Sequence, residues 1–115
     1  MAVEITEEFV WQNIPPRARD SHKGTFGSVL AVAGSAFYRG AALLAAEGAL
    51  RTGAGIVTLA SVEPVVSAAV TRLPECCLCP CKEGPQGGIA PENVPLLRRP
   101  PATVRLLGPG LGRPA

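Results

Sequence analysis

The densest group of chemically capable side chains is the polar stretch Asp20–Gly24, which holds the single histidine of the chain. An imidazole next to a carboxylate can act as a general base, and a neighbouring lysine can face a phosphate. No serine or cysteine nucleophile is placed to need a base at His22. The spacing therefore favours a hydrogen-bonded loop histidine over a catalytic one, and Lys23 carries no assigned role from spacing alone.

The four cysteines form a second group between Cys76 and Cys81. Cys76 and Cys79 have the CxxC spacing, which is one half of many structural zinc sites. Such a site needs four ligands, and the usual second pair, well separated in sequence, is missing. We therefore expect reduced, partly buried thiols and no metal site.

Glycine loops form the third group, and they could bind a ligand through their backbone. Gly34, followed by Gly40 and Ala41 at the start of an apolar helix, offers amides and a helix N-terminus that could hold an anionic group. The spacing matches neither a dinucleotide fingerprint nor a Walker loop, so tight turns are an equal alternative. For Gly108–Gly112, which follows a strand, we expect ligand contact. Gly53–Gly55 is expected to be structural.

The elements that must position these groups alternate between strand and helix. The apolar, β-branched and helix-forming runs predict strand 28–33, helix 40–52, strand 56–60, helix 64–72, strand 76–80, helical turns 91–98 and strand 103–107. This order predicts an α/β fold with a parallel sheet and helices on both faces. In such sheets, ligands bind beyond the carboxyl ends of the strands. Function is therefore expected at Gly34–Arg39, Ser61–Glu63 and Gly108–Gly112.

Composition limits the classes of protein that this chain can represent. It has 115 residues, 47% of them hydrophobic and 17% charged, which suits one small globular domain. The net charge of +2 is spread along the chain, so we expect no nucleic-acid partner. The apolar stretch 29–50 is interrupted by polar residues, and residues 1–9 are acidic. We therefore expect no membrane span, no secretory signal and a cytoplasmic location.

Several sequence blocks together resemble a known family. They are Asp20–Gly27, Val29–Ser35, Gly40–Ala42, Ala49–Thr58, Leu73–Glu75 and Gly108–Gly112. In this order they are similar to the start of the NAD(P)H-hydrate dehydratases, the carbohydrate-kinase-like YjeF C-terminal family. The resemblance covers about residues 8–112. It implies a ribokinase-like three-layer sandwich with a mainly parallel sheet, of which residues 1–115 would be the N-terminal part of a single domain, truncated after the glycine loop.

The resemblance also implies an activity and a set of site residues. Members use ADP or ATP, with Mg²⁺ expected, to dehydrate the S epimer of hydrated NADH or NADPH. Carried over by motif, Ala41, Gly108 and Gly110 would bind the hydrated dinucleotide. His22, Lys23, Gly34 and Gly40 would be either substrate-site or structural residues. A homo-oligomer is expected for the full-length protein.

The chain also departs from the family pattern. The later histidine loop, the lysine-bearing strand and the Gly-Thr-Gly-Asp motif of the family are not in this sequence. We therefore expect no catalytic residue among these 115 and no activity from them alone. Two alternatives stay open: a noncatalytic nucleotide-binding fragment, and a small-molecule kinase of the same fold. The Asp20–Gly27 block argues against the kinase.

Overall fold

The computed structural model describes residues 2–112, so both ends of the expected 1–115 segment lie outside the described residues. The helices are α1 (Glu7–Asn13), α2 (Arg39–Arg51), α3 (Glu63–Arg72) and α4 (Val94–Arg98), with short 3-10 turns η1 (Lys23–Phe26) and η2 (Pro91–Asn93). The strands are β1 (Ser28–Val32), β2 (Ile56–Val62), β3 (Cys77–Cys81) and β4 (Val104–Leu107).

The four strands form one sheet in the order β3-β2-β1-β4, and all three pairings are parallel. At the centre, Val29 lies opposite Val57 on one side and Val104 on the other. Because every connection between parallel strands must return to the same edge, the chain crosses over the sheet between strands. All the carboxyl ends of the strands therefore lie along one edge of the sheet, which we call the carboxyl edge. The opposite edge is the amino edge.

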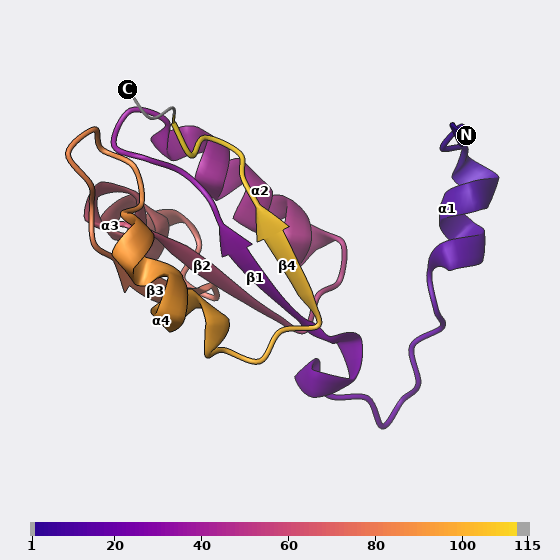
Figure 1. Cartoon of the computed structure of the whole chain (residues 1–115). Coiled ribbons are helices and arrows are strands. Elements are labelled where there is room, and N and C mark those ends of the chain that lie inside the picture. The colour runs from indigo at the N-terminus through magenta and orange to yellow at the C-terminus, as the bar shows by residue number, and fades with distance from the viewer. Residues whose placement is uncertain (1, 113–115) are drawn as a thin grey trace.

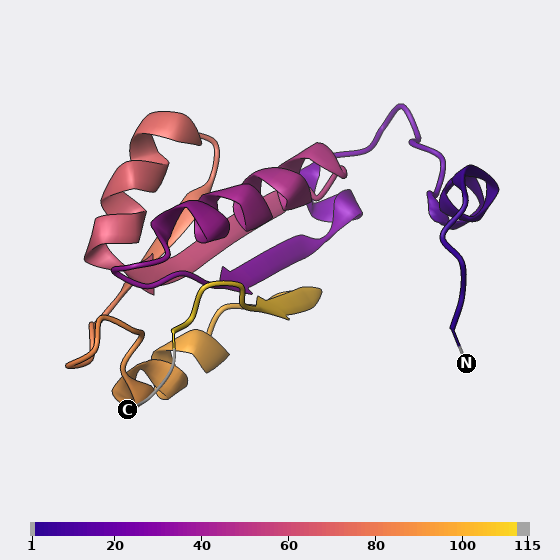
Figure 2. The same cartoon turned by 90° about the horizontal axis from the view of Figure 1, so that it is seen from above.

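Helices cover both faces of the sheet, which makes three layers. Figure 2 shows α2 and α3 on one face and α4 on the other. On the first face, alanines of α2 pack against Leu59 and Val57, and Val65 of α3 completes the cluster. On the second face, Leu30 and Cys81 pack with Leu97 of α4. The predicted α/β class with a parallel sheet is confirmed.

The element order predicted from sequence is confirmed, with boundaries shifted by one or two residues. The predicted strand 56–60 extends to Val62, and α3 begins immediately at Glu63. The ligand loop expected at Ser61–Glu63 is therefore wrong, because these residues belong to a strand and a helix. Ser61 itself is fully buried.

Helix α1 was not expected from the sequence. Thr6 caps this helix by accepting a hydrogen bond from the N–H of Phe9 (3.1 Å). None of its residues is buried, and both views place it apart from the sheet (Figures 1 and 2). Its Trp11 side chain stays 67% exposed, so no core contact fixes this helix to the sheet. Among the described residues, no helix is long and apolar enough to cross a membrane.

Candidate functional site

Two glycine-containing loops meet at the carboxyl edge, where β1 and β4 end side by side. The N–H of Gly34 donates to the carbonyl of Pro109 (2.8 Å), and the N–H of Gly108 donates to the carbonyl of Val32 (2.8 Å). These reciprocal bonds continue the β1–β4 pairing beyond the strands. The loop after β4 is thereby held against the loop that leads into α2.

This arrangement brings together two of the residues expected at the site, Ala41 and Gly110. A Cβ built on Gly110 would lie 3.4 Å from the Cβ of Ala41 and 3.0 Å from the carbonyl oxygen of Tyr38. The φ of Gly110 is +74°, a value that favours glycine. The small side chain of Ala41 and the absent one of Gly110 therefore let the loop after β4 pack closely against the start of α2.

The other expected glycines occupy different surroundings. Gly108 is half-buried and Gly40 is exposed, and a Cβ on either would meet nothing within 4 Å. Gly34 is buried, and a Cβ there would lie 2.8 Å from the Cβ of Ala42 and 3.1 Å from the Oγ of Ser61. Gly108 and Gly40 therefore border open space, whereas Gly34 lets β1 pass close under α2.

The start of α2 presents the positive end of a helix to this edge. Its cap residue Tyr38 makes no side-chain hydrogen bond to the first turn, and the first turn holds no acidic side chain. The first N–H groups of a helix have no partner within the helix and favour an anion. Arg39 adds a guanidinium at the first position, where its Nε donates to the carbonyl of Ala36 (2.7 Å). We call the start of α2 together with the glycine loop after β4 the corner. Its chemistry suits an anionic ligand.

Two serines at this edge lie in the segments 34–39 and 61–63, where function was expected from the sequence, but neither was named there as a site residue. Ser35 is 2% exposed and Ser61 is fully buried, and the Oγ of each has no hydrogen-bond partner among the described residues. A buried hydroxyl without a partner is costly, since it has lost water without replacement. Their position directly after, or at the end of, buried β runs was the only available signal.

His22 and Lys23 lie at the amino edge of the sheet, opposite the glycine loops. The Nδ1 of His22 accepts a hydrogen bond from the N–H of Gly24 (3.1 Å), and the N–H of His22 donates to the Thr25 hydroxyl (3.2 Å). These reciprocal bonds cap the short turn η1. The backbone of Lys23 lies directly against Gly55. These contacts support the structural alternative for both residues.

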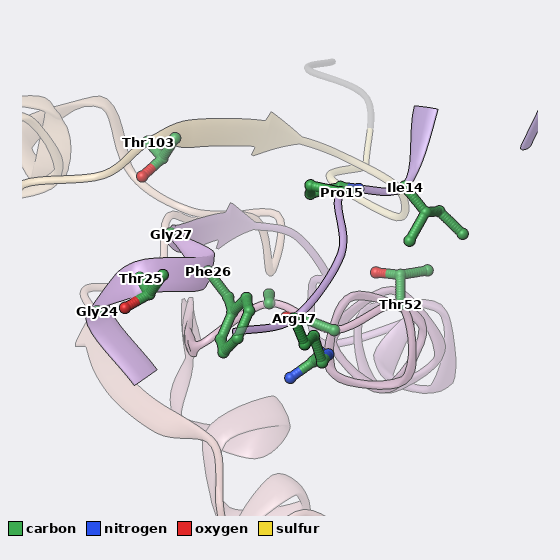
Figure 3. Close-up of a pocket in the computed structure, with 11 residues that line it drawn as sticks. Ile14, Pro15, Arg17, Gly24, Thr25, Phe26, Gly27, Thr52 and Thr103 are labelled. Atoms are coloured by element: carbon green, nitrogen blue, oxygen red, sulfur yellow. The ribbon is translucent and has the colours of Figure 1, made fainter. Parts of the chain in front are cut away.

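A surface recess of about 550 Å³ also lies at the amino edge (Figure 3). The guanidinium of Arg17 lies 4.1 Å from the ring centre of Phe26 and donates to the carbonyl of Gly53 (3.4 Å). This contact ties the segment after α1 to the end of α2. The polar groups named here already bond to the chain itself. The residues that line the recess therefore stabilise the fold and leave none of these groups unpaired for a ligand.

All four cysteines are free thiols; Cys76 and Cys81 are buried and Cys79 is half-buried, whereas Cys77, contrary to the expected partial burial, is exposed. Burial raises the pKa of the Cys76 thiol, and burial together with the nearby Cys79 raises that of Cys81 to about 11. Thiols held in the protonated form are poor nucleophiles and poor metal ligands. Among the described residues, no group of three or more His, Cys, Asp or Glu side chains is placed to hold a metal ion.

With this geometry established, the comparisons with known proteins identify the family. A family model described as NAD(P)H-hydrate dehydratase matches residues 29–115. The chain belongs to the NAD(P)H-hydrate dehydratase family. The matched region of the family includes Ala41, Gly108 and Gly110 at the carboxyl edge, whereas His22 and Lys23 precede it.

Curated relatives in the NAD(P)H-hydrate dehydratase family support this placement. The chain is 38% identical over 111 residues to the ADP-dependent (S)-NAD(P)H-hydrate dehydratase of Listeria monocytogenes, covering 95% of this chain and 37% of the relative. It is 41% identical over 107 residues to the bifunctional NAD(P)H-hydrate repair enzyme Nnr of Coxiella burnetii, covering 90% of this chain and 20% of that protein. The chain thus spans about a third or less of the length of these relatives.

Solved structures agree with the fold. A ribokinase-like superfamily protein from Enterococcus faecalis superposes with a TM-score of 0.77 at 28% identity, covering 96% of this chain and 36% of that one. The ADP/ATP-dependent NAD(P)H-hydrate dehydratase of Bacillus subtilis, co-crystallised with ATP/Mg²⁺, has a TM-score of 0.59 at 45% identity, covering 64% of this chain and 26% of that one. The expected ribokinase-like fold is confirmed.

Proposed function

We propose that this chain forms the substrate-binding part of an enzyme that dehydrates the S epimer of hydrated NADH or NADPH, using ADP or ATP. The observation that carries the proposal is the close approach of α2 and the loop after β4, which places Ala41 beside Gly110 at the carboxyl edge. Curated relatives are ADP-dependent (S)-NAD(P)H-hydrate dehydratases, which indicates the reaction. The start of α2 and the glycine loop form a corner suited to an anionic nucleotide.

In this proposal the residues of the chain bind and orient the dinucleotide. Gly110 lets the loop after β4 lie close to Ala41, and the dinucleotide binds against the backbone of this loop and the start of α2. Gly108 and Gly40 keep the entrance open, since a Cβ on either would meet no neighbour within 4 Å. Gly34 keeps the helix start close to the strand end. His22 and Lys23 stabilise the turn η1 and its packing at the amino edge.

The phosphoryl donor acts on this bound substrate in the full-length protein. ADP or ATP, when bound, supplies the phosphoryl group that converts the hydroxyl of the hydrate into a leaving group. Among residues 2–112, no group of three or more His, Cys, Asp or Glu side chains is placed to hold Mg²⁺. We assign the donor site to the portion of the relatives that this chain does not span.

The direct test is an assay of the full-length protein that carries this sequence. Hydrated NADH is supplied with ADP or ATP, and recovery of the absorbance of reduced nicotinamide is followed. We expect recovery that depends on the donor nucleotide. Absence of recovery with every donor, while the protein remains folded, would refute the proposed activity.

A pair of matched variants links the activity to the proposed site. Ala41→Val places two methyl groups toward Gly110, whereas Ala45→Val makes the same change one turn further along α2, away from the loop. Both residues are half-buried. We expect Ala41→Val to weaken NADH binding about tenfold or more. Ala45→Val should match the wild type in binding, apart from the small loss of helix propensity shared by both variants.

The same assay separates the alternatives. A protein that binds NADH but never restores it from the hydrate is the noncatalytic binding protein. A protein that instead phosphorylates a sugar or a hydroxymethylpyrimidine is the kinase. We also propose a homo-oligomer and a cytoplasmic location for the full-length protein, which light scattering and cell fractionation test.

A further inference from the structure

We propose that the hydroxyl of Ser35 is a substrate-binding group that donates a hydrogen bond to a phosphate oxygen of the nicotinamide dinucleotide. The inference rests on the proposed function and names a residue to which no role has been assigned. It begins from a single feature, a polar atom that the fold buries and leaves without a partner.

The position of Ser35 fits a binding role. It lies between Gly34, which is bonded to Pro109, and the first residues of the turn into α2, where its carbonyl accepts from the N–H of Tyr38 (3.1 Å). Its Oγ lies 3.8 Å from the position that a Cβ on Gly112 would take. The buried hydroxyl therefore lies against the glycine loop, on the side of Ser35 that faces Gly112.

The chemistry of the corner points to a phosphate. The start of α2 has no side-chain cap and no acidic residue in its first turn. A phosphate at a helix N-terminus accepts bonds from backbone N–H groups, and a serine hydroxyl is a frequent additional donor. A bound phosphate oxygen would give the Ser35 hydroxyl the partner that the described chain does not provide. Burial then strengthens the bond, since little water competes.

Ser61 provides the internal comparison, because it shares the burial and the missing partner but not the surroundings. Its Oγ lies 3.1 Å from the position of a Cβ on Gly34, in contact range of the core under α2 and α3. Val65 and Ala42 border the same point. Ser61 therefore faces the interior of the fold, and we assign it no contact with the dinucleotide.

The experiment compares Ser35→Ala with Ser61→Ala in the full-length protein. Calorimetry measures the affinity for NADH and, separately, for ADP, and thermal unfolding is followed without ligand. We expect Ser35→Ala to weaken NADH about tenfold, as loss of a bond to a charged acceptor does. Its ADP affinity should stay within about twofold of the wild type. Ser61→Ala should leave both affinities unchanged.

Unliganded stability gives a readout that a structural role would move in the other direction. Removing a buried hydroxyl that has no partner does not destabilise a fold, so the midpoint of unliganded Ser35→Ala should equal or exceed that of the wild type. In turnover with the hydrate, KM should rise while kcat holds, because a bond to a remote phosphate is made equally in the ground and transition states. Ser35→Cys, with a weaker donor, should be intermediate.

Several results would overturn the assignment. These are an unchanged NADH affinity in Ser35→Ala, an equal loss for ADP, an equal loss in Ser61→Ala, or a lower unliganded midpoint. Failure of the proposed function looks different, since the wild type would then neither bind NADH nor restore it from the hydrate. A wild type that works together with an unaffected Ser35→Ala refutes the role of Ser35 alone.

Discussion

The two edges of the sheet use their polar groups differently. At the amino edge, the Nδ1 of His22, the guanidinium of Arg17 and the hydroxyl of Thr103 all bond to the chain itself. At the carboxyl edge, the hydroxyls of Ser35 and Ser61 have no partner among the described residues, and α2 begins without a side-chain cap. Polar groups at the amino edge thus complete the fold, whereas the start of α2 and the Ser35 hydroxyl at the carboxyl edge are left for the proposed ligand.

The largest expected effect is on stability, at the amino edge. Gly55→Ala would place a Cβ on the carbonyl of Lys23, which is backbone and cannot rotate away. We expect a loss of about 3 kcal/mol or more of the free energy of unfolding, measured by urea denaturation. The control is Gly48→Ala in α2, where a Cβ meets nothing within 4 Å. This variant should raise the free energy of unfolding by about 1 kcal/mol. Equal midpoints for the two variants would contradict the close packing at this edge.

At the carboxyl edge, Gly110→Ala should reduce both binding and stability. An alanine at this φ of +74° would place its Cβ 3.0 Å from the Tyr38 carbonyl oxygen and strain the loop. The free energy of unfolding should fall by about 1–3 kcal/mol. NADH affinity should fall more than tenfold, as the strained loop moves away from Ala41. Calorimetry and urea denaturation of the same samples check this. A variant that binds NADH normally would separate the loop from the site.

Arg17→Ala removes a contact at the amino edge without touching the glycine loops. The lost cation–π contact with Phe26 and the bond to Gly53 should lower the free energy of unfolding by about 1 kcal/mol. NADH affinity should be unchanged. A selective loss of affinity with intact stability would instead make the amino-edge recess a ligand site.

Alkaline pH should destabilise the fold through Cys81. The pKa of Cys81 is raised to about 11 from 9.0, so the folded chain holds this proton more tightly than the unfolded chain does. The resulting stabilisation is complete below pH 9.0 and is lost as pH rises toward about 11. Urea midpoints measured across this window should fall with pH, less steeply in Cys81→Ala. Parallel slopes would contradict the burial of this thiol. NADH binding below this window should be the same in both proteins.

The sequence predicted the sheet well because the local patterns and the tertiary structure agree. The apolar run through Leu30 and the alanine-rich helix before Gly53 are buried or packed as their composition indicates. By contrast, α1 has no buried face, so no apolar periodicity predicts it. Only the capping residue Thr6 indicates where it begins. The loop expected at 61–63 was wrong because β2 continues through Ser61 to Val62 and α3 begins at Glu63.

The candidate site was predictable only in part. Glycine loops and a helix start could be placed from their spacing and from the family resemblance. The partnerless hydroxyls of Ser35 and Ser61 could not, because burial and hydrogen bonding depend on segments far apart in sequence. The same holds for the contact of Gly110 with Ala41, which requires the β1–β4 pairing.

The most direct test of the division between the two edges is hydrogen exchange of the full-length protein with and without NADH. We predict that NADH slows exchange in peptides covering residues 34–42 and 108–112, where the amides of the carboxyl edge lie. Peptides covering residues 14–27 and 52–55 at the amino edge should exchange at the same rate in both states. Protection confined to the amino edge, with none at the glycine loops, would contradict the placement of the ligand site at the carboxyl edge.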